Sequence, residues 1–463
     1  MNHHFRMCYL SPGRRMSTVL GLILAASLLC AQPRVIGYYP MWLRSTIPAS
    51  AVRFDFVTHV NHAFAWPNAD GSLAADESTA DTALINTAHR AGRKVLLSLG
   101  GAGTTQTTNF ALVASDTSLR RKFVANVVAR LSAFGYDGAD LDWEGPANLA
   151  DKANEVALVQ QMRAAFHAAD SAWLLTMAVG VSDWSGQWRD FAALRGSVDW
   201  FNAMTYDIFG SWSPYTGHNA PMVEPPAHTG DWSVTQGITY LHVTRGIPGS
   251  QLTLGLPFFG QRFLSTAGLY AKFGSAAEVT YTDVWGDRVA GWTYAWDTVS
   301  QVPYLVNPAG TALDSFDDSV SIGVKCAYAR TSGLSGVMIW ALGEDLWGGR
   351  QPLMEAVGSA MGTSTAIGPG VVPPAGGGFV LTNSYPNPFN PSTTLRYGIP
   401  RRMDVSIVVY NILGQTVGEI VRGVQEAGVH EARFEAGSLP SGVYFARIRA
   451  GEFTAVREMV YVK

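Results

Sequence analysis

Short apolar runs alternate with amphipathic segments from residue 35 to about residue 362 of the chain. One of the longer segments, 119–134, repeats apolar side chains at the spacing of a helix. The apolar runs predict strands near residues 35–39, 56–64, 94–99, 136–143, 173–179, 198–205, 252–258 and 335–341. Eight strands alternating with helices predict an α/β chain folded as a (β/α)8 TIM barrel over residues 32–362, in which functional residues lie at the carboxyl ends of the strands.

The stretch between the seventh and eighth predicted strands is too long for one loop and one helix. It contains β-rich pieces at 278–281, 291–295 and 303–306, which predict a small α+β insertion over about residues 263–318.

The composition changes after the barrel. Residues 363–378 are rich in Gly and Pro and predict a linker. Beyond it, 405–410 and 443–448 are typical of strands, with turns predicted at 413–415 and 439–442. Residues 379–463 are therefore expected to form a β-sandwich of immunoglobulin-like type.

The first residues are typical of an export signal. Arg14 and Arg15 precede the apolar run 19–29, which is too short to span a bilayer. We expect a signal peptide over 1–31, cleaved after Ala31, and no transmembrane segment once it is removed. The mature chain would keep one cysteine, Cys326, which we expect to be buried and inert.

Bulk properties narrow the possible partners. The chain has 463 residues, 47% of them hydrophobic and 15% charged, as in a soluble globular protein. The formal net charge of -3 makes nucleic acid and anionic membrane surfaces poor candidates. The 14 Trp and 17 Tyr exceed what a core needs and suit a cleft that stacks on sugar rings. Zinc-type Cys/His spacing and a phosphate-binding glycine loop are both missing from the sequence, so neither a metal nor a cofactor is expected.

The fourth predicted strand ends in a column of carboxylates. Residues 137–144 read DGADLDWE, and alternate residues of a strand share a face, so Asp140, Asp142 and Glu144 point the same way. Repulsion over such short spacing is expected to raise the pKa of at least one of them. A protonated carboxyl beside an ionised one is the apparatus of glycoside hydrolysis. The alternatives are a solvated acidic edge or a divalent-cation site, although cation loops usually mix Asn, Ser and Gly with their acids.

The pattern Asp-x-x-Asp-x-Asp-x-Glu at 137–144 resembles the signature of family eighteen glycoside hydrolases, the chitinases and their relatives. Six further segments resemble strands of that family in the same order: 34–39 (RVIGYY), 58–64 (THVNHAF), 94–101 (KVLLSLGG), 204–207 (MTYD), 255–260 (GLPFFG) and 336–340 (GVMIW). The predicted insertion resembles the α+β element that walls one side of the cleft in chitinases. Several ordered motifs are far more specific than any single one.

The resemblance implies a role for each acid. Glu144 would donate a proton to the glycosidic oxygen, while the 2-acetamido carbonyl of the substrate attacks the anomeric carbon. Asp142 would orient the acetamide N–H and balance the positive charge of the intermediate, and Asp140 would share a proton with Asp142. Tyr206 would donate its hydroxyl to the acetamide carbonyl, and Asp207 would hydrogen-bond the sugar.

The remaining substrate contacts implied by the resemblance are aromatic or lie on strands. Trp340 would form the floor under the reacting sugar, and Tyr38, Phe64 and Met204 would lie beside it. Taken singly, each is more often a packing residue of a barrel interior. Arg262 would also contact substrate, although Gln261 stands where the family usually has its arginine.

The C-terminal part resembles the sorting domain of type IX secretion cargo. The resembling segments are 385–391 (YPNPFNP), 410–415 (YNILGQ), 441–445 (SGVYF) and the terminal Val462 and Lys463. The resemblance implies contact with the type IX secretion machinery and export across both membranes of an outer-membrane bacterium, to the medium or the cell surface. A carbohydrate-binding or spacer sandwich is the alternative.

Together these features predict a secreted chitinase that acts on chitin or chitooligosaccharides. A first alternative is an endo-β-N-acetylglucosaminidase acting on N-glycan cores, against which the chitinase-type insertion argues. A second is a chitin-binding lectin without activity. Such relatives lose the acid, whereas this chain keeps Glu144, Asp142 and Tyr206.

Overall fold

The computed structural model describes residues 32–74, 81–224, 230, 232–362, 380, 381, 384, 389–399, 401–411, 415–451, 453–461 and 463. The chain divides into two compact units, Met1–Gln32 and Pro33–Lys463, and only Gln32 of the first is described. The predicted signal peptide and linker, and most of the segment 385–391, lie outside the described residues.

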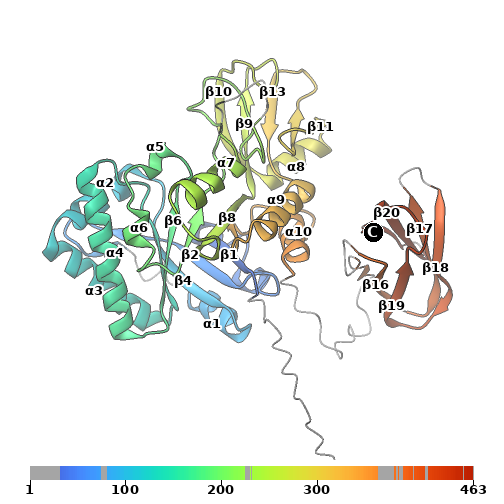
Figure 1. Cartoon of the computed structure of the whole chain (residues 1–463), viewed down its shortest axis with the longest axis horizontal. Coiled ribbons are helices and arrows are strands. Elements are labelled where there is room, and N and C mark those ends of the chain that lie inside the picture. Colours follow the sequence, from blue (N-terminus) through green and yellow to red (C-terminus); the bar gives the residue numbers. More distant parts are fainter. Residues whose placement is uncertain are drawn as a thin grey trace, which may run out of the picture. The chain divides into compact units, whose positions relative to one another are not determined.

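A closed parallel barrel forms the larger part of the second unit (Figure 1). Its strands are β1 (Arg34–Pro40), β2 (His59–Pro67), β4 (Lys94–Gly100), β5 (Gly138–Asp142), β6 (Leu174–Val179), β7 (Trp200–Ala203), β8 (Leu252–Pro257) and β14 (Gly336–Trp340). Each pairs in parallel with its neighbours, and β1 closes the ring because it pairs with both β14 and β2. The short β3 (Leu73–Ala74) adds an antiparallel partner to the end of β2. The predicted TIM barrel is confirmed.

The helices of the barrel lie outside the strands (Figure 1). They are α1 (Thr82–Arg90), α2 (Thr104–Ser115), α3 (Thr117–Phe134), α4 (Leu149–Ala169), α5 (Asp183–Gly186), α6 (Phe191–Leu194), α7 (Val234–Thr239), α9 (Ser319–Thr331) and α10 (Pro352–Met361). The shorter turns are η1 (Met41–Leu43), η2 (Ala49–Ala51), the π-helical η5 (Tyr240–Thr244) and η6 (Gly249–Gln251). Helix α3 begins where the Asp116 carboxylate accepts hydrogen bonds from the backbone of Ser118 and Leu119, and ends at the left-handed Gly135.

The strands bury both faces, as expected for a parallel barrel. Outward-facing side chains such as Val95 and Leu141 pack under the helices in the main core, with Phe123 of α3 and Leu158 of α4. A smaller cluster fills the barrel interior and is formed by Ile36, Tyr38, Ala63, Trp200 and Met338. The interior is therefore occupied by side chains, and function is left to the rim.

The predicted insertion between the last two barrel strands is a separate antiparallel sheet (Figure 1). It comprises β9 (Phe259–Leu264), β10 (Ser275–Thr280), α8 (Tyr281–Val289), β11 (Thr293–Asp297), β12 (Val302–Val306) and β13 (Ala312–Ser315), with strand order β10-β9-β13-β12-β11. Strand β9 begins before the expected start at 263. The piece predicted at 278–281 ends one residue early, because Thr280 and Asp283 form a capping box that starts α8.

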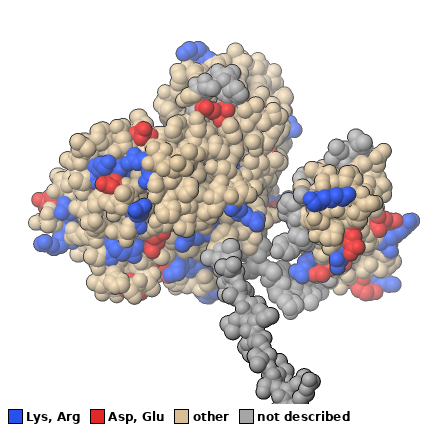
Figure 2. All heavy atoms as spheres, viewed as in Figure 1, with Lys and Arg blue, Asp and Glu red and all other residues tan. Residues whose placement is uncertain are grey.

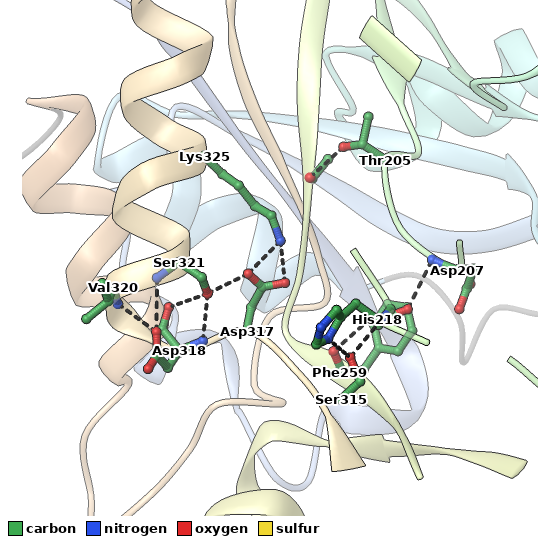
Figure 3. Close-up of polar contacts among 12 residues, drawn as sticks. Thr205, Asp207, His218, Phe259, Ser315, Asp317, Asp318, Val320, Ser321 and Lys325 are labelled. Atoms are coloured by element: carbon green, nitrogen blue, oxygen red, sulfur yellow. Dashed lines mark hydrogen bonds and ion pairs between the residues drawn. The ribbon is translucent and has the colours of Figure 1, made fainter. Parts of the chain in front are cut away.

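A buried ion pair fixes α9 where the chain returns from the insertion to the barrel. The ammonium of Lys325 lies 2.5 and 2.6 Å from the two carboxylate oxygens of Asp317, and Ser321 donates to the same carboxylate (Figure 3). Asp318 caps the first turn of α9 through the backbone of Val320 and Ser321. Both members of the pair are almost completely shielded from solvent, so removing either one would leave a buried, unpaired charge and destabilise the fold.

The C-terminal part of the chain contains two antiparallel sheets. The first has the order β15 (Val380–Leu381), β16 (Ser392–Ile399), β19 (Gly428–Glu435), and the second the order β18 (Thr416–Gln425), β17 (Met403–Asn411), β20 (Gly442–Ala450), β21 (Phe453–Tyr461). Both sheets contribute to one core, as Leu395 of β16 and Ile407 of β17 illustrate. The strands predicted at 405–410 and 443–448 are confirmed by β17 and β20, while the immunoglobulin-like topology stays a prediction.

The surface mixes charges of both signs. On the face seen in Figure 2, Lys and Arg are interspersed with Asp and Glu, and much of the surface of the barrel and insertion is uncharged. Among the described residues, no helix is long and apolar enough to cross a membrane.

Candidate active site

The carboxylate column lies at the end of β5, as the alternation predicted. Asp140 and Asp142 are buried on the inner side of the barrel, whereas Trp143 packs outward and stacks on Phe110 of α2 at 5.7 Å between ring centroids. Glu144 lies two residues beyond the end of the strand and is exposed. The column therefore runs from the closed interior to the open rim of the barrel.

Asp140 is the best-bound acid of the column. Its carboxylate accepts hydrogen bonds from Tyr38 (2.6 Å), Ser98 (3.0 Å), Thr176 (2.5 Å) and Asn202 (3.0 Å), which come from four other barrel strands. Burial raises the pKa of Asp140, and these donors act against the rise because they favour the charged form. Two carboxylate oxygens that accept four hydrogen bonds are suited to carry a negative charge.

Desolvation and neighbouring negative charges favour the protonated forms of Asp142 and Glu144. Burial raises the pKa of Asp142 well above its usual value, and the negative charges of Glu144 and Asp140 add to the rise. One buried oxygen of Asp142, Oδ1, has no hydrogen-bond partner within the described structure. Glu144 keeps exposed surface at the rim, but partial desolvation by its surroundings raises its pKa as well, with a further contribution from the negative charge of Asp207. The expected rise in pKa is confirmed, and the arrangement can present a protonated carboxyl at the rim.

The segment from Met204 to Asp207 follows β7 and brings the tyrosine to the column. Thr205 anchors it by donating to the carbonyl of Gly255 at 2.7 Å, and the Asp207 amide donates to Asn219 Oδ1 at 3.0 Å (Figure 3). The ring of Tyr206 meets Phe259 edge-on at 5.5 Å between centroids. Burial and the nearby carboxylates raise the pKa of Tyr206 well above its usual value, so its hydroxyl stays a donor. Met204 lies in the interior cluster beside it.

Aromatic rings form one side of the same rim. Trp340, at the end of β14, stacks on Phe64 with centroids 5.7 Å apart, and Tyr38 lies 5.5 Å from the same indole. Trp42 joins them at 6.4 Å from Trp340 and is 58% exposed. The structure thus brings the predicted aromatic residues together, next to the hydroxyl of Tyr38 that binds Asp140.

Arg262 is held inside the insertion. Its guanidinium donates to both oxygens of Asp314 at 2.7 Å, forms a second ion pair with Asp287, and lies over the ring of Trp292. The preceding residue, Gln261, donates to Asp207 Oδ1 at 3.0 Å. The amide of Gln261, which was not predicted as a site residue, is therefore the polar side chain of β9 that contacts a predicted site residue. A substrate contact of Arg262 stays a prediction.

Several site residues were missed from the sequence. Asn202 lies on β7, two residues before Met204, so the alternation of that strand could have indicated it. Thr176 is a polar residue inside the apolar strand β6, which is a second usable signal. Arg189, in a loop, and Glu155, in helix α4, carry no such signal.

In the part of the chain that the structure describes, no group of three or more His, Cys, Asp or Glu side chains could hold a metal ion. The arrangement offers an exposed acid, a buried carboxylate behind it, a tyrosine donor and a stacking surface, which together suit acid-catalysed cleavage of a glycosidic bond.

Comparison with known proteins identifies the two parts of the chain. Residues 34–345 match the model of glycosyl hydrolases family 18, and residues 383–463 match that of the secretion system C-terminal sorting domain. The chain is 31% identical to chitinase A1 of Niallia circulans over 54% of its own length and 40% of that protein. It is 29% identical to chitinase 1 of Aphanocladium album over 64% of its own length and 76% of that protein.

Solved structures agree with the family. A catalytic domain of the group II chitinase of Ostrinia furnacalis superposes with a TM-score of 0.65 at 27% identity, covering 71% of this chain and 96% of that one. A family GH18 chitinase from Cycas revoluta, solved with allosamidin, gives the same TM-score and identity and covers 71% and 99% of the two chains. The chain belongs to glycosyl hydrolases family 18.

Proposed function

We propose that the protein is a secreted chitinase that hydrolyses β-1,4 bonds between N-acetylglucosamine units with retention of configuration. The observation that carries the proposal is the carboxylate column, which runs from the buried Asp140 and Asp142 to the exposed Glu144, next to Tyr206 and the ring of Trp340. Both curated relatives described above are named chitinases, which favours the same substrate class.

In the proposed reaction Glu144 protonates the glycosidic oxygen as the bond to the leaving sugar breaks. The acetamido carbonyl of the substrate forms the new bond to the anomeric carbon, and Tyr206 holds it in the attacking position. Asp142 accepts a hydrogen bond from the acetamide N–H and balances the positive charge of the intermediate. Water then opens the intermediate, and Glu144 takes back its proton from that water.

Asp140 shares a proton with Asp142 and sets its pKa. Its four donors hold the Asp140 carboxylate in place through the cycle. Trp340 stacks on the reacting sugar, with Phe64 and Tyr38 supporting the indole. Asp207 hydrogen-bonds the sugar from the side of the insertion, where Gln261 holds it.

The domain organisation is part of the proposal. Residues 1–31 act as the signal peptide, 32–362 as the catalytic barrel, 363–378 as the linker and 379–463 as the sorting domain. The match to a sorting domain indicates secretion or cell-surface export. We infer that the type IX machinery recognises this domain and that the enzyme crosses both membranes of an outer-membrane bacterium.

Product analysis tests the substrate. Chitin oligomers and a high-mannose glycopeptide are incubated in parallel with the protein, and the products are identified by mass spectrometry. We expect shortened N-acetylglucosamine oligomers and an intact glycopeptide. Cleavage of the glycopeptide core alone would make the protein an endo-β-N-acetylglucosaminidase, and binding of oligomers without any cleavage would make it a lectin.

A further inference from the structure

A buried ion pair lies behind the carboxylate column. Arg189, in the loop between α5 and α6, has 2% of its surface exposed, and Glu155 of α4 is completely buried. Arg189 Nη1 lies 2.9 Å from Glu155 Oε1. Apart from this ion pair, neither oxygen of Glu155 has a hydrogen-bond partner within the described structure. Burying two charges is unfavourable unless they are well matched, so the pair calls for an explanation.

The other end of Arg189 reaches the catalytic segment. Its Nη2 donates a hydrogen bond to the carbonyl of Trp143, in the peptide that precedes Glu144. Strand β5 ends at Asp142, and beyond it side chains take over the backbone bonds: Thr107 Oγ1 donates to the carbonyl of Glu144 at 2.9 Å. The peptides on both sides of Glu144 are thus fixed by side chains.

The loop that carries Arg189 is itself anchored. Arg245, which follows η5, donates to the carbonyls of Gly186 at 2.8 Å and Arg189 at 2.7 Å. The guanidinium of Arg245 also lies over the ring of Phe191. Because Arg245 holds the backbone of this loop, Arg189 is kept in a fixed position against the catalytic segment.

We propose that Arg189 and Glu155 form a positioning pair for the catalytic acid: Arg189 fixes the Trp143–Glu144 peptide and places a positive charge behind Asp142 and Glu144, and Glu155 moderates that charge. Arg189 acts on the chemistry through Glu144 and does not touch the substrate. The inference rests on the proposed glycoside hydrolysis.

The electrostatics support this role. The positive charge of Arg189 lowers the pKa of both Asp142 and Glu144, against the rise caused by burial and by neighbouring acids. Burial raises the pKa of Glu155 to about 7, with Arg189 opposing the rise, so Glu155 is about half ionised at neutral pH and gains its full charge only above it. Inside a protein such charges act over longer distances than in water.

Other charged groups surround the pair. On α4, Asp151 adds to the rise in the pKa of Glu155, and Lys152 donates to the carbonyl of Gln187 at 3.4 Å. Asp183 forms a long ion pair of 3.9 Å with Arg245. The remaining neighbours are Asp190, which caps α6, and Asp140 and Asp207, which face the column from the barrel. Each of these groups is retained in the variants below.

The test compares pH profiles of kcat/KM on chitin oligomers. Arg189→Met removes the positive charge, so the pKa values of Asp142 and Glu144 rise. The acidic and the alkaline limb of the pH profile should then both move to higher pH by about one unit. Glu155→Gln leaves the charge of Arg189 unbalanced above neutral pH, so the alkaline limb should move to lower pH. Arg189→Lys keeps the charge without the fork that reaches Trp143, so kcat should fall while the profile stays in place.

A matched arginine supplies the control. Arg163 lies on the same helix as Glu155 and pairs with Asp199 at 2.5 Å, where it also donates to the carbonyl of Ser197. Arg163→Met should lower the thermal unfolding temperature and leave the pH profile of the wild type. If Arg189→Met is poorly folded, the double variant Arg189→Met/Glu155→Leu replaces the pair by apolar groups, which buried pairs often tolerate. Its alkaline limb should still move to higher pH.

A second readout is independent of turnover. The carboxyl carbon of Glu144, followed by ¹³C NMR in protein labelled at glutamate Cδ and assigned through Glu144→Gln, reports the pKa directly. Inactive wild-type protein would count against the proposed function, while the NMR titration would still decide on the pair. Equal titration of Glu144 in the wild type and in Arg189→Met, or shifts of the same sign in Arg189→Met and Glu155→Gln, would overturn the inference.

Discussion

Replacement of Tyr206 by phenylalanine separates catalysis from stability. In the free protein the Tyr206 hydroxyl donates to Met338 Sδ at 3.7 Å, and a thioether is a weak acceptor. The ring contact with Phe259 is kept in Tyr206→Phe, so the free energy of unfolding should fall by less than about 1 kcal/mol. The hydroxyl is thus available for the substrate.

The catalytic loss should be larger than the loss of stability. A neutral hydrogen bond contributes about 0.5–1.5 kcal/mol, which corresponds to roughly a 2- to 13-fold change in rate. Misplacing an internal nucleophile costs more than the bond itself, so kcat on N-acetylated oligomers should fall roughly 10- to 100-fold. The measurement is the hydrolysis rate of a chitin pentamer, together with the thermal unfolding temperature of each protein.

Tyr136→Phe is the matched control. The hydroxyl of Tyr136 is hydrogen-bonded to His62 Nδ1 at 2.8 Å in the main core, away from the rim. Its removal should lower the free energy of unfolding by about 1 kcal/mol and leave kcat unchanged. An unchanged kcat in Tyr206→Phe would refute the assigned role. Appreciable hydrolysis of glucose oligomers, which lack the acetamide, by the wild type would refute substrate assistance altogether.

Four further changes have defined outcomes. Glu144→Gln should lower the rate on unactivated oligomers by about 10²–10⁴-fold and leave oligomer binding intact, measured by product formation and calorimetry. Desolvation is the largest cause of the raised pKa of Glu144, and the negative charge of Asp207 is the second. Asp207→Asn removes that charge, so the alkaline limb of the pH profile of kcat/KM should move to lower pH. Lys325→Met leaves Asp317 buried without its cation and should cost about 3–5 kcal/mol in a denaturant titration. A chain ending at Gly362 should keep full activity on soluble oligomers. Measurement of the intact mass should show that the secreted enzyme lacks the sorting domain. A full-length secreted chain that binds insoluble chitin through residues 379–463 would instead favour a carbohydrate-binding domain.

The barrel could be predicted because its signal is local. Each buried strand is a short apolar run, and the order of runs and helices fixes the fold class. The limits of the strands were less certain. The second strand was expected from residue 56, but the amides of Phe56 and Val57 both donate back to the carbonyl of Arg53, so this stretch is a turn and β2 begins at His59. A turn can bury an apolar side chain as completely as a strand does, and Val57 in this turn is completely buried.

The carboxylate column was predictable for the same reason, since a period of two is a property of the strand alone. The partners of Asp140 were not, because Thr176 and Asn202 reach it from strands far away in the sequence. Their meeting depends on closure of the barrel and on the register between β5, β6 and β7. Arg262 shows the converse: a residue expected from the resemblance to contact substrate is paired with Asp287 and Asp314 of the insertion.

The pair of Arg189 and Glu155 illustrates why a motif is only part of an active site. The octapeptide at 137–144 supplies three acids, but their protonation depends on charges that other elements place behind them. A charged residue in an irregular loop and one in a helix are ordinarily solvated, so neither attracts notice in the sequence. Here both are buried, and the loop is bound to the helix through the ion pair and to the catalytic segment through the carbonyl of Trp143. Chains with the same octapeptide and an apolar pair at these two positions should therefore hold their acid at a different pKa, which a comparison of pH profiles would measure directly.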